Sequence, residues 1–311
     1  MNLGYACINM ELNARKGEDR VTTNRSMIKK TFQEKGLDYA SELIIQNVVD
    51  LNEIIDWNEQ NNIKFFRMSS DVFPWASEYY NDWDSVPNID FIKMWLENAG
   101  LKAKEYGHRI TSHPGPFNVL VSPNENVVQN TITDLTIHGD IFDMMGLSRT
   151  PYNKLNIHCN GVYGDKQSAL DRFCKNFERL PESVQTRLTV ENDDKASMYS
   201  VKDLYEGIHK RIGIPITFDY HHYKFNTGGQ TEQEALELAL STWGDITPVV
   251  HYSESKAEHE LNESIKPQAH SDLIKELPNT YGNDVDIMVE AKHKELAIKS
   301  FVKYFTQLKD L

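Results

Sequence analysis

The sequence predicts an α/β protein of the (β/α)8 TIM-barrel class, with residues 1–311 forming a single domain. Eight short runs rich in β-branched and aromatic residues alternate with longer segments whose apolar residues recur at helical spacing. The length of 311 residues suits one such barrel. A doubly wound open sheet is the alternative, but the Gly-rich phosphate loop expected after its first strand is missing.

The predicted elements alternate strictly along the chain. We interpret eight runs as strands, at residues 3–8, 63–69, 109–113, 154–158, 188–191, 215–219, 248–251 and 285–290. In the first helical segment, Ile44, Val48, Leu51 and Ile55 recur at steps of three and four residues. The segments that we expect to be helical are 41–61, 90–106, 125–145, 166–178, 200–211, 231–241, 268–277 and 292–308.

Composition and charge narrow the class of protein. The chain is 40% hydrophobic and 25% charged, as in an ordinary globular domain, and it has no apolar run long enough to cross a membrane. It begins directly with a strand, and its three cysteines form no CxxC pair, so we expect a cytoplasmic protein without a thiolate zinc site. The net charge of −13 weakens the case for a nucleic-acid partner, although carboxylates that bind metal would account for part of it.

Six successive strands end in His, Asp or Glu. From the third strand to the eighth, these residues are His113, His158, Glu191, Asp219 with His222, His251 and Glu290. A single such residue is more often a hydrogen-bonded structural side chain or a helix cap. A barrel, however, brings all its strand ends into one ring, so six in a row converge on one pocket.

This convergence predicts a metal centre. Clustered carboxylates repel one another, divalent cations relieve that repulsion, and mixed nitrogen and oxygen ligands suit zinc or manganese. His270, at the start of the predicted 268–277 helix, could lean over the strand ends, whereas His221 is a weaker candidate on spacing. About eight candidate ligands exceed the needs of one ion and suit two or three, an arrangement typical of phosphoester hydrolases.

Several segments together resemble a known family, the UV damage endonucleases, which are barrel enzymes related to endonuclease IV. The resemblance covers nearly the whole chain. Its most specific segments are Glu191-Asn192-Asp193-Asp194-Lys195, Phe218-Asp219-Tyr220-His221-His222 and Val289-Glu290-Ala291-Lys292, in this order. Others are Phe66-Arg67-Met68-Ser69-Ser70, Ser112-His113-Pro114, Asn156-Ile157-His158, His251-Tyr252-Ser253 and Ala269-His270-Ser271-Asp272.

The resemblance implies a ligand set, a reaction and a substrate. The implied ligands of two or three divalent ions are His113, His158, Glu191, Asp219, His222, His251, His270 and Glu290. Manganese is the usual metal of the family, with zinc and magnesium as alternatives. The implied reaction is cleavage of damaged double-stranded DNA immediately 5′ of a UV photoproduct, leaving a 3′-hydroxyl and a 5′-phosphate. We further expect a monomer, associated with the nucleoid if the source is bacterial.

The resemblance also assigns residues that probe the opened duplex. These are Tyr5 and Asn9, for which barrel packing and a turn position are the alternatives, and Phe117. Pro116 departs from the family, which carries a Gln there, and it cannot donate a hydrogen bond. Val249 stands where relatives have a modifiable Lys, so one metal is expected to bind more weakly; Lys266 lies in a nearby insertion.

The hypothesis for catalysis assigns roles within this set. Glu191 bridges two metals, Glu290 and Asp219 complete their shells, and a third ion near His222 and His251 stabilises the departing 3′ oxygen. We therefore expect Glu191, Glu290 and His251 to be catalytic.

Two basic residues are candidates for supporting the reaction. Arg67 and Lys292 are candidates for phosphate contact or for orienting a carboxylate.

Two other classes of function stay open on the sequence alone. Xylose isomerase-like sugar isomerases or epimerases use a similar ring of acids and histidines, and a small polar substrate would suit the acidic chain. A non-catalytic protein that binds metal or DNA is the third possibility. Turnover of a ketose without nicking of DNA would favour the sugar isomerase or epimerase. Tight metal binding without cleavage of DNA would favour the non-catalytic binding protein.

Overall fold

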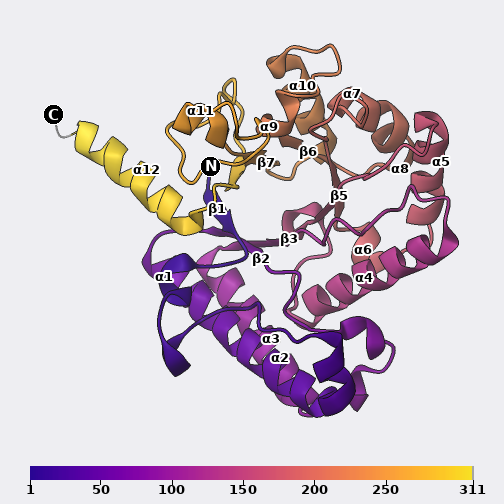
Figure 1. The fold of residues 1–311 in the computed structure, drawn as a ribbon, viewed down its shortest axis with the longest axis vertical. Helices are drawn as coiled ribbons and strands as arrows, with labels where there is room; N and C mark the ends of the chain where they lie inside the picture. Colours follow the sequence, from indigo (N-terminus) through magenta and orange to yellow (C-terminus); the bar gives the residue numbers. More distant parts are fainter. Residues whose placement is uncertain (310–311) are drawn as a thin grey trace.

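The eight strands close into one parallel barrel in the computed structural model, which describes residues 1–309 (Figure 1). Neighbours in sequence pair in register, and β8 pairs back to β1, so the predicted fold class is confirmed. The strands are β1 (Leu3–Ala6), β2 (Phe65–Met68), β3 (Arg109–Ser112), β4 (Leu155–Ile157), β5 (Leu188–Glu191), β6 (Ile216–Asp219), β7 (Val249–Tyr252) and β8 (Asp286–Val289).

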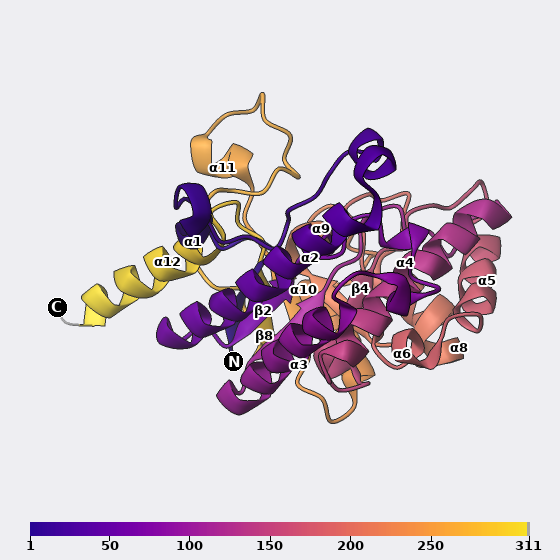
Figure 2. The ribbon, with the colours of Figure 1, turned by 90° about the horizontal axis from the view of Figure 1, so that it is seen from below.

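Helices run between the strands and surround the barrel (Figures 1 and 2). The longer ones are α2 (Lys29–Gln60), α3 (Ile89–Tyr106), α4 (Glu125–Met144), α5 (Lys166–Phe177), α10 (Glu232–Leu240) and α12 (Lys294–Lys309). One segment is continuous through a π turn, from α7 (Val201–Leu204) to α8 (Lys210–Ile212). Short helices are α1 (Met10–Asn13), α6 (Glu182–Gln185), α9 (Tyr220–Tyr223) and α11 (Lys256–Glu260).

The helix predicted for residues 268–277 is wrong. This segment is irregular, and the helix of the long β7–β8 connection is α11 instead. Backbone N–H groups of Lys275 and Glu276 donate to the Glu254 carboxylate, and that of Ser271 donates to the Glu254 carbonyl. These bonds replace the i to i−4 pattern of a helix, so Glu254 folds the segment that carries His270 as a loop.

The first predicted helix also differs, since it begins twelve residues earlier than residue 41. α2 starts at Lys29 and bends at Gly36, whose φ of 62° lies in the left-handed region that glycine tolerates. The apolar spacing begins only near residue 41, which explains why the polar first turns were not recognised. The remaining predicted helices are confirmed with small shifts at their ends.

Helix packing follows from the spacing of small and apolar residues. In α3, Ile92, Leu96, Ala99 and Ala103 are buried at steps of three and four residues. A Cβ atom at Gly100 would lie 1.6 Å from the backbone oxygen of Met145, so only glycine permits this approach of α3 to the end of α4. Such contacts fix the helices against the strands and hold the strand ends in place.

Two buried arginines lie at strand starts, toward the amino-terminal end of the barrel. Arg109 lies 3.1 Å from Asp286 and donates to the carbonyl oxygens of Tyr152 and Thr247. Arg187 pairs with Asp143 at 2.8 Å. These ion pairs are structural, and in a barrel of this class the chemistry takes place at the opposite, carboxyl-terminal face.

Two further observations concern the described residues. Within residues 1–309, none of the helices is both long and apolar enough to span a membrane. The cysteines are free thiols: Cys159 and Cys174 are buried, and Cys7 is half-buried.

Candidate metal centre

A cavity opens at the carboxyl-terminal end of the barrel and brings most of the expected ligands together. It has a volume of about 320 Å³, and the expected residues that line it are Arg67, His113, His158, Glu191, His222, His270 and Glu290. Asp219 and His251 lie beneath it and are buried. The convergence that the strand ends predict is therefore present, with all eight expected ligands in or directly under one cavity.

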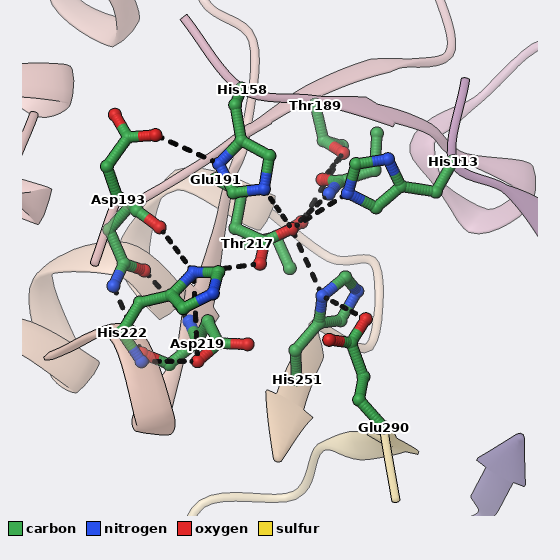
Figure 3. A network of polar contacts seen from close by, with 12 residues as sticks. His113, His158, Thr189, Glu191, Asp193, Thr217, Asp219, His222, His251 and Glu290 are labelled. Carbon is green, nitrogen blue, oxygen red and sulfur yellow. Dashed lines mark hydrogen bonds and ion pairs between the residues drawn. The ribbon is translucent and has the colours of Figure 1, made fainter. Parts of the chain in front are cut away.

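Glu191 lies at the middle of this cluster, as Figure 3 shows. It is the last residue of β5, is 1% exposed, and accepts a hydrogen bond from Asn156. His251 Nδ1 lies 3.1 Å from its carboxylate, and His113 Nε2 and His222 Nδ1 each lie 3.4 Å from it. His158 Nε2 is 3.7 Å away. One carboxylate thus faces four imidazoles.

Two groups of side chains have the spacing of metal ligands. His113, His158 and Glu191 form one group, and Glu191, Asp219 and His251 form the other. Within each group the ligand atoms lie within 4.8 Å of one another. Glu191 belongs to both groups, so its carboxylate would be shared if each group held an ion.

The chemistry of the donors fits divalent cations. Asp219 is fully buried, one of its oxygens accepts from the His222 backbone N–H at 2.7 Å, and the other oxygen has no hydrogen-bond partner. A buried carboxylate oxygen without a partner costs free energy unless a cation or a proton meets it. Mixed imidazole and carboxylate ligands suit manganese or zinc.

The electrostatics of the carboxylates point the same way. Burial would raise the pKa of Glu191, but His251 and His158 hold the pKa of this carboxyl well below its usual value. Burial also opposes ionisation of Glu290, whose pKa is nevertheless lowered by Arg67 and His251. Burial raises the pKa of Asp219 to about 7. Two carboxylates are thus held ionised, whereas Asp219 without a cation is about half protonated at neutral pH.

The imidazoles divide into two kinds. Burial would lower the pKa of His222, but Asp219 and Glu191 raise it to about 9. Burial lowers the pKa of His251 to about 4 despite the nearby Glu191. His251 is therefore neutral at physiological pH, the form that binds a metal, whereas His222 carries a proton that a bound ion would displace.

Each histidine of the cluster has a second partner that orients its ring. His113 Nδ1 lies 3.1 Å from the Pro114 carbonyl, and His222 Nδ1 lies 2.9 Å from the Asn192 carbonyl. His158 Nδ1 lies 3.2 Å from an Asp193 carboxylate oxygen. Such second partners fix the tautomer and direction of a ligating imidazole.

His270 is held by the loop that replaces the predicted helix. Its Nδ1 lies 2.6 Å from the Ser253 hydroxyl, and its ring lies 5.3 Å from that of His221, which is fully buried. The loop position therefore still brings His270 to the cavity wall, although the reason is tertiary folding and not a helix. His221 itself does not line the cavity.

The two basic candidates differ in position. Arg67, on β2, lines the cavity and forms an ion pair with Glu290, with both side chains about 15% exposed. This contact suits orientation of the carboxylate. Lys292 is exposed outside the cavity, and its backbone N–H donates to the Ser271 carbonyl at 2.9 Å. A phosphate contact stays a prediction for Lys292.

Tyr5 and Asn9, expected to probe DNA, are packed inside the protein. Tyr5 is fully buried, and its hydroxyl donates to Asn58 at 2.8 Å and accepts from Asn9 at 3.0 Å. Asn9 is 1% exposed and caps α1 by accepting from the Leu12 N–H. For these two residues probing stays a prediction that requires movement, and packing is what the structure describes.

Phe117, by contrast, is displayed on the surface. It is 87% exposed and sits on the loop after β3 that also carries Pro116. Pro116 lines the metal cavity and also a neighbouring cavity of about 600 Å³, which Phe117 and Asn118 share. An exposed aromatic ring beside the metal cavity is suited to stack on or wedge between bases.

Val249, which stands where relatives have a Lys, contributes no polar group to the candidate metal centre. Val249 is buried beside Ala6, Phe65, Trp243 and Met288 and offers no polar atom. Lys266 is exposed and does not line the cavity. A lysine amine from the start of a different strand, β4, lies under the candidate ligands instead.

That amine belongs to Lys154, which precedes β4 and is 1% exposed. Its Nζ lies 3.0 Å from His251 Nε2. Burial lowers the pKa of Lys154 well below its usual value.

Several residues of the centre were not found from the sequence. They are Cys7 and Asn160 in the cavity wall, and Lys154, Asn156, Asp193 and Ser253 behind the ligands. Cys7 follows β1 with a φ of 69°, which turns the chain at the cavity rim. Asn156, Asp193 and Ser253 each lie in a segment that carries the family resemblance, and that place was the available signal.

Comparisons with known proteins agree over the whole chain. Residues 1–311 match the family described as UV-endonuclease UvdE. The UV-damage endonuclease of Schizosaccharomyces pombe is 38% identical over 306 residues, covering 95% of this chain but 49% of that protein. The UV DNA damage endonuclease of Bacillus cereus strain B4264 is 30% identical over 300 residues, covering 93% of this chain and 90% of that protein.

Solved structures add a close and a distant likeness. The crystal structure of SacUVDE has a TM-score of 0.83 and 31% identity, with 100% of both chains covered. A xylose isomerase domain protein from Planctomyces limnophilus has a TM-score of 0.52 at 12% identity, covering 82% of this chain and 91% of that one. The second likeness shows a shared barrel fold and nothing about the reaction.

Proposed function

The chain belongs to the UV-endonuclease UvdE family, and from that premise we propose that it is a metal-dependent endonuclease acting on UV-damaged duplex DNA. It hydrolyses the phosphodiester bond immediately 5′ of a photoproduct and leaves a 3′-hydroxyl and a 5′-phosphate. The observation that carries this proposal is the position of Glu191, which is shared by two groups of candidate ligands. A paired metal centre is a common solution for in-line displacement at phosphorus.

The candidate ligands fall into two groups that would hold different ions. Glu191 bridges the two ligand groups, with His113 and His158 on one side and Asp219 and His251 on the other. Two or three divalent ions, with manganese expected, would lower the pKa of an attacking water and stabilise the departing 3′ oxygen.

Glu290 and Arg67 complete the cavity wall. The ion pair keeps Glu290 ionised and directed at the cavity, close to His251 Nδ1 at 3.3 Å. A charge-assisted contact of this kind holds a carboxylate in one orientation. The cavity wall therefore presents a fixed carboxylate to an ion, while His222 and His270 line the same cavity.

We assign selection of damaged DNA to the loop after β3, which carries Pro116 and Phe117. Phe117 is exposed at the rim, where it can fill the space left when distorted bases unstack. Unstacking costs less at damaged positions than in regular duplex, which gives a physical basis for selectivity.

A nicking assay tests the proposal. Irradiated and unirradiated supercoiled plasmid are incubated with the protein and Mn²⁺, and a parallel reaction contains a chelator. We expect nicking of irradiated plasmid only, and loss of that nicking with the chelator. Equal nicking of both plasmids would contradict lesion specificity, and nicking that persists with the chelator would contradict metal dependence.

A further inference from the structure

One histidine of the centre is held differently from the other four. Each of the four turns Nδ1 toward an oxygen of the protein; these pairs are His113 with the Pro114 carbonyl, His158 with Asp193, His222 with the Asn192 carbonyl and His270 with Ser253. His222 Nδ1 also lies 3.4 Å from Glu191. His251 differs in the group on the other side of its ring: Nδ1 faces Glu191 at 3.1 Å and Glu290 at 3.3 Å, and Nε2 faces the amine of Lys154 at 3.0 Å. An amine is an unusual second partner, because carboxylates, carbonyls and waters are the common ones.

Lys154 is also connected to Glu191 through a polar layer under the cavity. Its Nζ lies 3.2 Å from the Thr217 hydroxyl, which donates to Thr189 at 3.3 Å. Thr189 donates to Asn156 at 2.7 Å, and the Asn156 amide donates to Glu191. One buried side chain therefore contacts His251 directly and reaches Glu191 through three hydrogen-bonded neighbours.

Such a position has a cost that packing alone does not explain. Lysine is rarely fully buried, and an aliphatic side chain of similar volume would fill the same space without a desolvation penalty. Lys154 nevertheless is 1% exposed, and its amine meets the back of a candidate metal ligand. The alternative orientation of His251, with the ring turned over, would remove Nδ1 from the two carboxylates.

We propose that Lys154 is a positioning residue of the metal centre: it holds the His251 ring with Nδ1 directed between Glu191 and Glu290, and thereby sets the affinity of the ion bound on that side. The inference rests on the proposed metal binding but not on the DNA substrate. Without Lys154 the ring loses its anchor, and losing a residue that orients a ligand typically weakens metal affinity by about 10–100-fold.

The central variant is Lys154→Met, which keeps the length of the side chain and removes the amine. We expect one class of Mn²⁺ sites to weaken by about 10–100-fold, while the affinity on the side of His113 and His158 is retained. We also expect the metal-free variant to be at least as stable as the wild type, because a buried amine is replaced by a thioether. A lower Mn²⁺ affinity together with an equal or higher stability of the metal-free protein would identify Lys154 as a positioning residue.

Two further variants bracket this one. Thr217→Val removes the other partner of the Lys154 amine and leaves His251 untouched, so we expect a smaller loss of affinity. It also provides a measurement if Lys154→Met does not fold. The matched control is Lys166→Met: Lys166 contacts Met198 and Asp203 and none of the candidate ligands, so its loss should leave Mn²⁺ affinity unchanged.

The experiment is calorimetric titration of the metal-free full chain with Mn²⁺, together with urea unfolding of each metal-free variant. Unchanged Mn²⁺ affinity in Lys154→Met overturns the proposal, and so does a parallel loss of affinity and metal-free stability, which would indicate a merely structural role. A wild type that binds no Mn²⁺ overturns both this proposal and the proposed function. A wild type that binds Mn²⁺ with the expected dependence on Lys154, yet does not nick irradiated plasmid, overturns only the proposed function.

Discussion

Replacing Glu191 by Gln probes the part of the centre on which both candidate ligand groups depend. The substitution keeps the size of the side chain and can keep its contact with Asn156, but it removes the charge. Each ligand group then falls from three protein ligands to two, His113 with His158 on one side and Asp219 with His251 on the other. The carboxylate that the two groups share is then lost.

The expected loss can be worked from this sharing. Removing one preorganised electrostatic contact at a reacting centre costs about 10²-fold or more in rate. Because Glu191 serves two groups, we expect a loss of about 10⁴-fold, which corresponds to about 5.4 kcal/mol at 1.36 kcal/mol per decade. Mn²⁺ affinity should fall as well, since a bridging ligand contributes to both sites.

The assay is single-turnover nicking of irradiated plasmid at saturating protein. Glu295→Gln is the matched control, because Glu295 is also fully buried but lies on α12 and accepts from the Glu11 N–H instead of facing the cavity. The control should nick at the wild-type rate. A Glu191→Gln variant that nicks within tenfold of the wild type would refute the bridging role, whereas loss in both variants would indicate a folding defect.

Three other predictions test separate parts of the account. Asp193→Asn removes the charged partner of His158 Nδ1, so Mn²⁺ affinity measured by titration should fall by about 10–100-fold; an unchanged affinity would contradict the orienting role. Phe117→Ala should leave the urea midpoint unchanged, since the ring is 87% exposed. It should lower nicking of irradiated plasmid by about tenfold, because stacking on a base contributes about 1–3 kcal/mol; full activity would remove Phe117 from lesion recognition. Finally, Mn²⁺ at 100 times its Kd should raise the free energy of unfolding by about 2.7 kcal/mol, and no shift in thermal unfolding would argue against a site in the folded state.

The barrel was predictable because its signal is local and repeated. Each strand is a short apolar run, and each helix has apolar residues at helical spacing, so eight successive units identified the fold without long-range information. The same logic located the candidate ligands, because parallel strands in a barrel all end at one face. His113 through Glu290 could therefore be assigned to one centre before any distance was known.

What the sequence missed depends on contacts between distant segments. Residues 268–277 contain a plausible helix start, yet the carboxylate of Glu254 binds two of their N–H groups and folds them into a loop. Lys154 appeared only as the first residue of a strand. Its role depends on how far its side chain rises through the barrel interior toward His251, which no local pattern encodes.

For the residues expected to probe DNA, the sequence does not predict whether the side chain is exposed or buried. Tyr5 and Asn9 were assigned from the family resemblance, and the structure holds both in a buried hydrogen-bonded pair. Phe117 was assigned in the same way, is exposed, and lines the neighbouring cavity of about 600 Å³. The motif identifies the position in the chain, but only the fold shows which of these side chains is exposed.

The most direct test of the central claim uses a duplex oligonucleotide that contains a single UV photoproduct and a label at the 5′ end of the damaged strand. With Mn²⁺, we predict one incision immediately 5′ of the lesion and a labelled product whose 3′-hydroxyl a DNA polymerase can extend. The undamaged duplex should stay intact. Incision elsewhere, a product that cannot be extended, or no incision by a protein shown to bind Mn²⁺ would contradict the account.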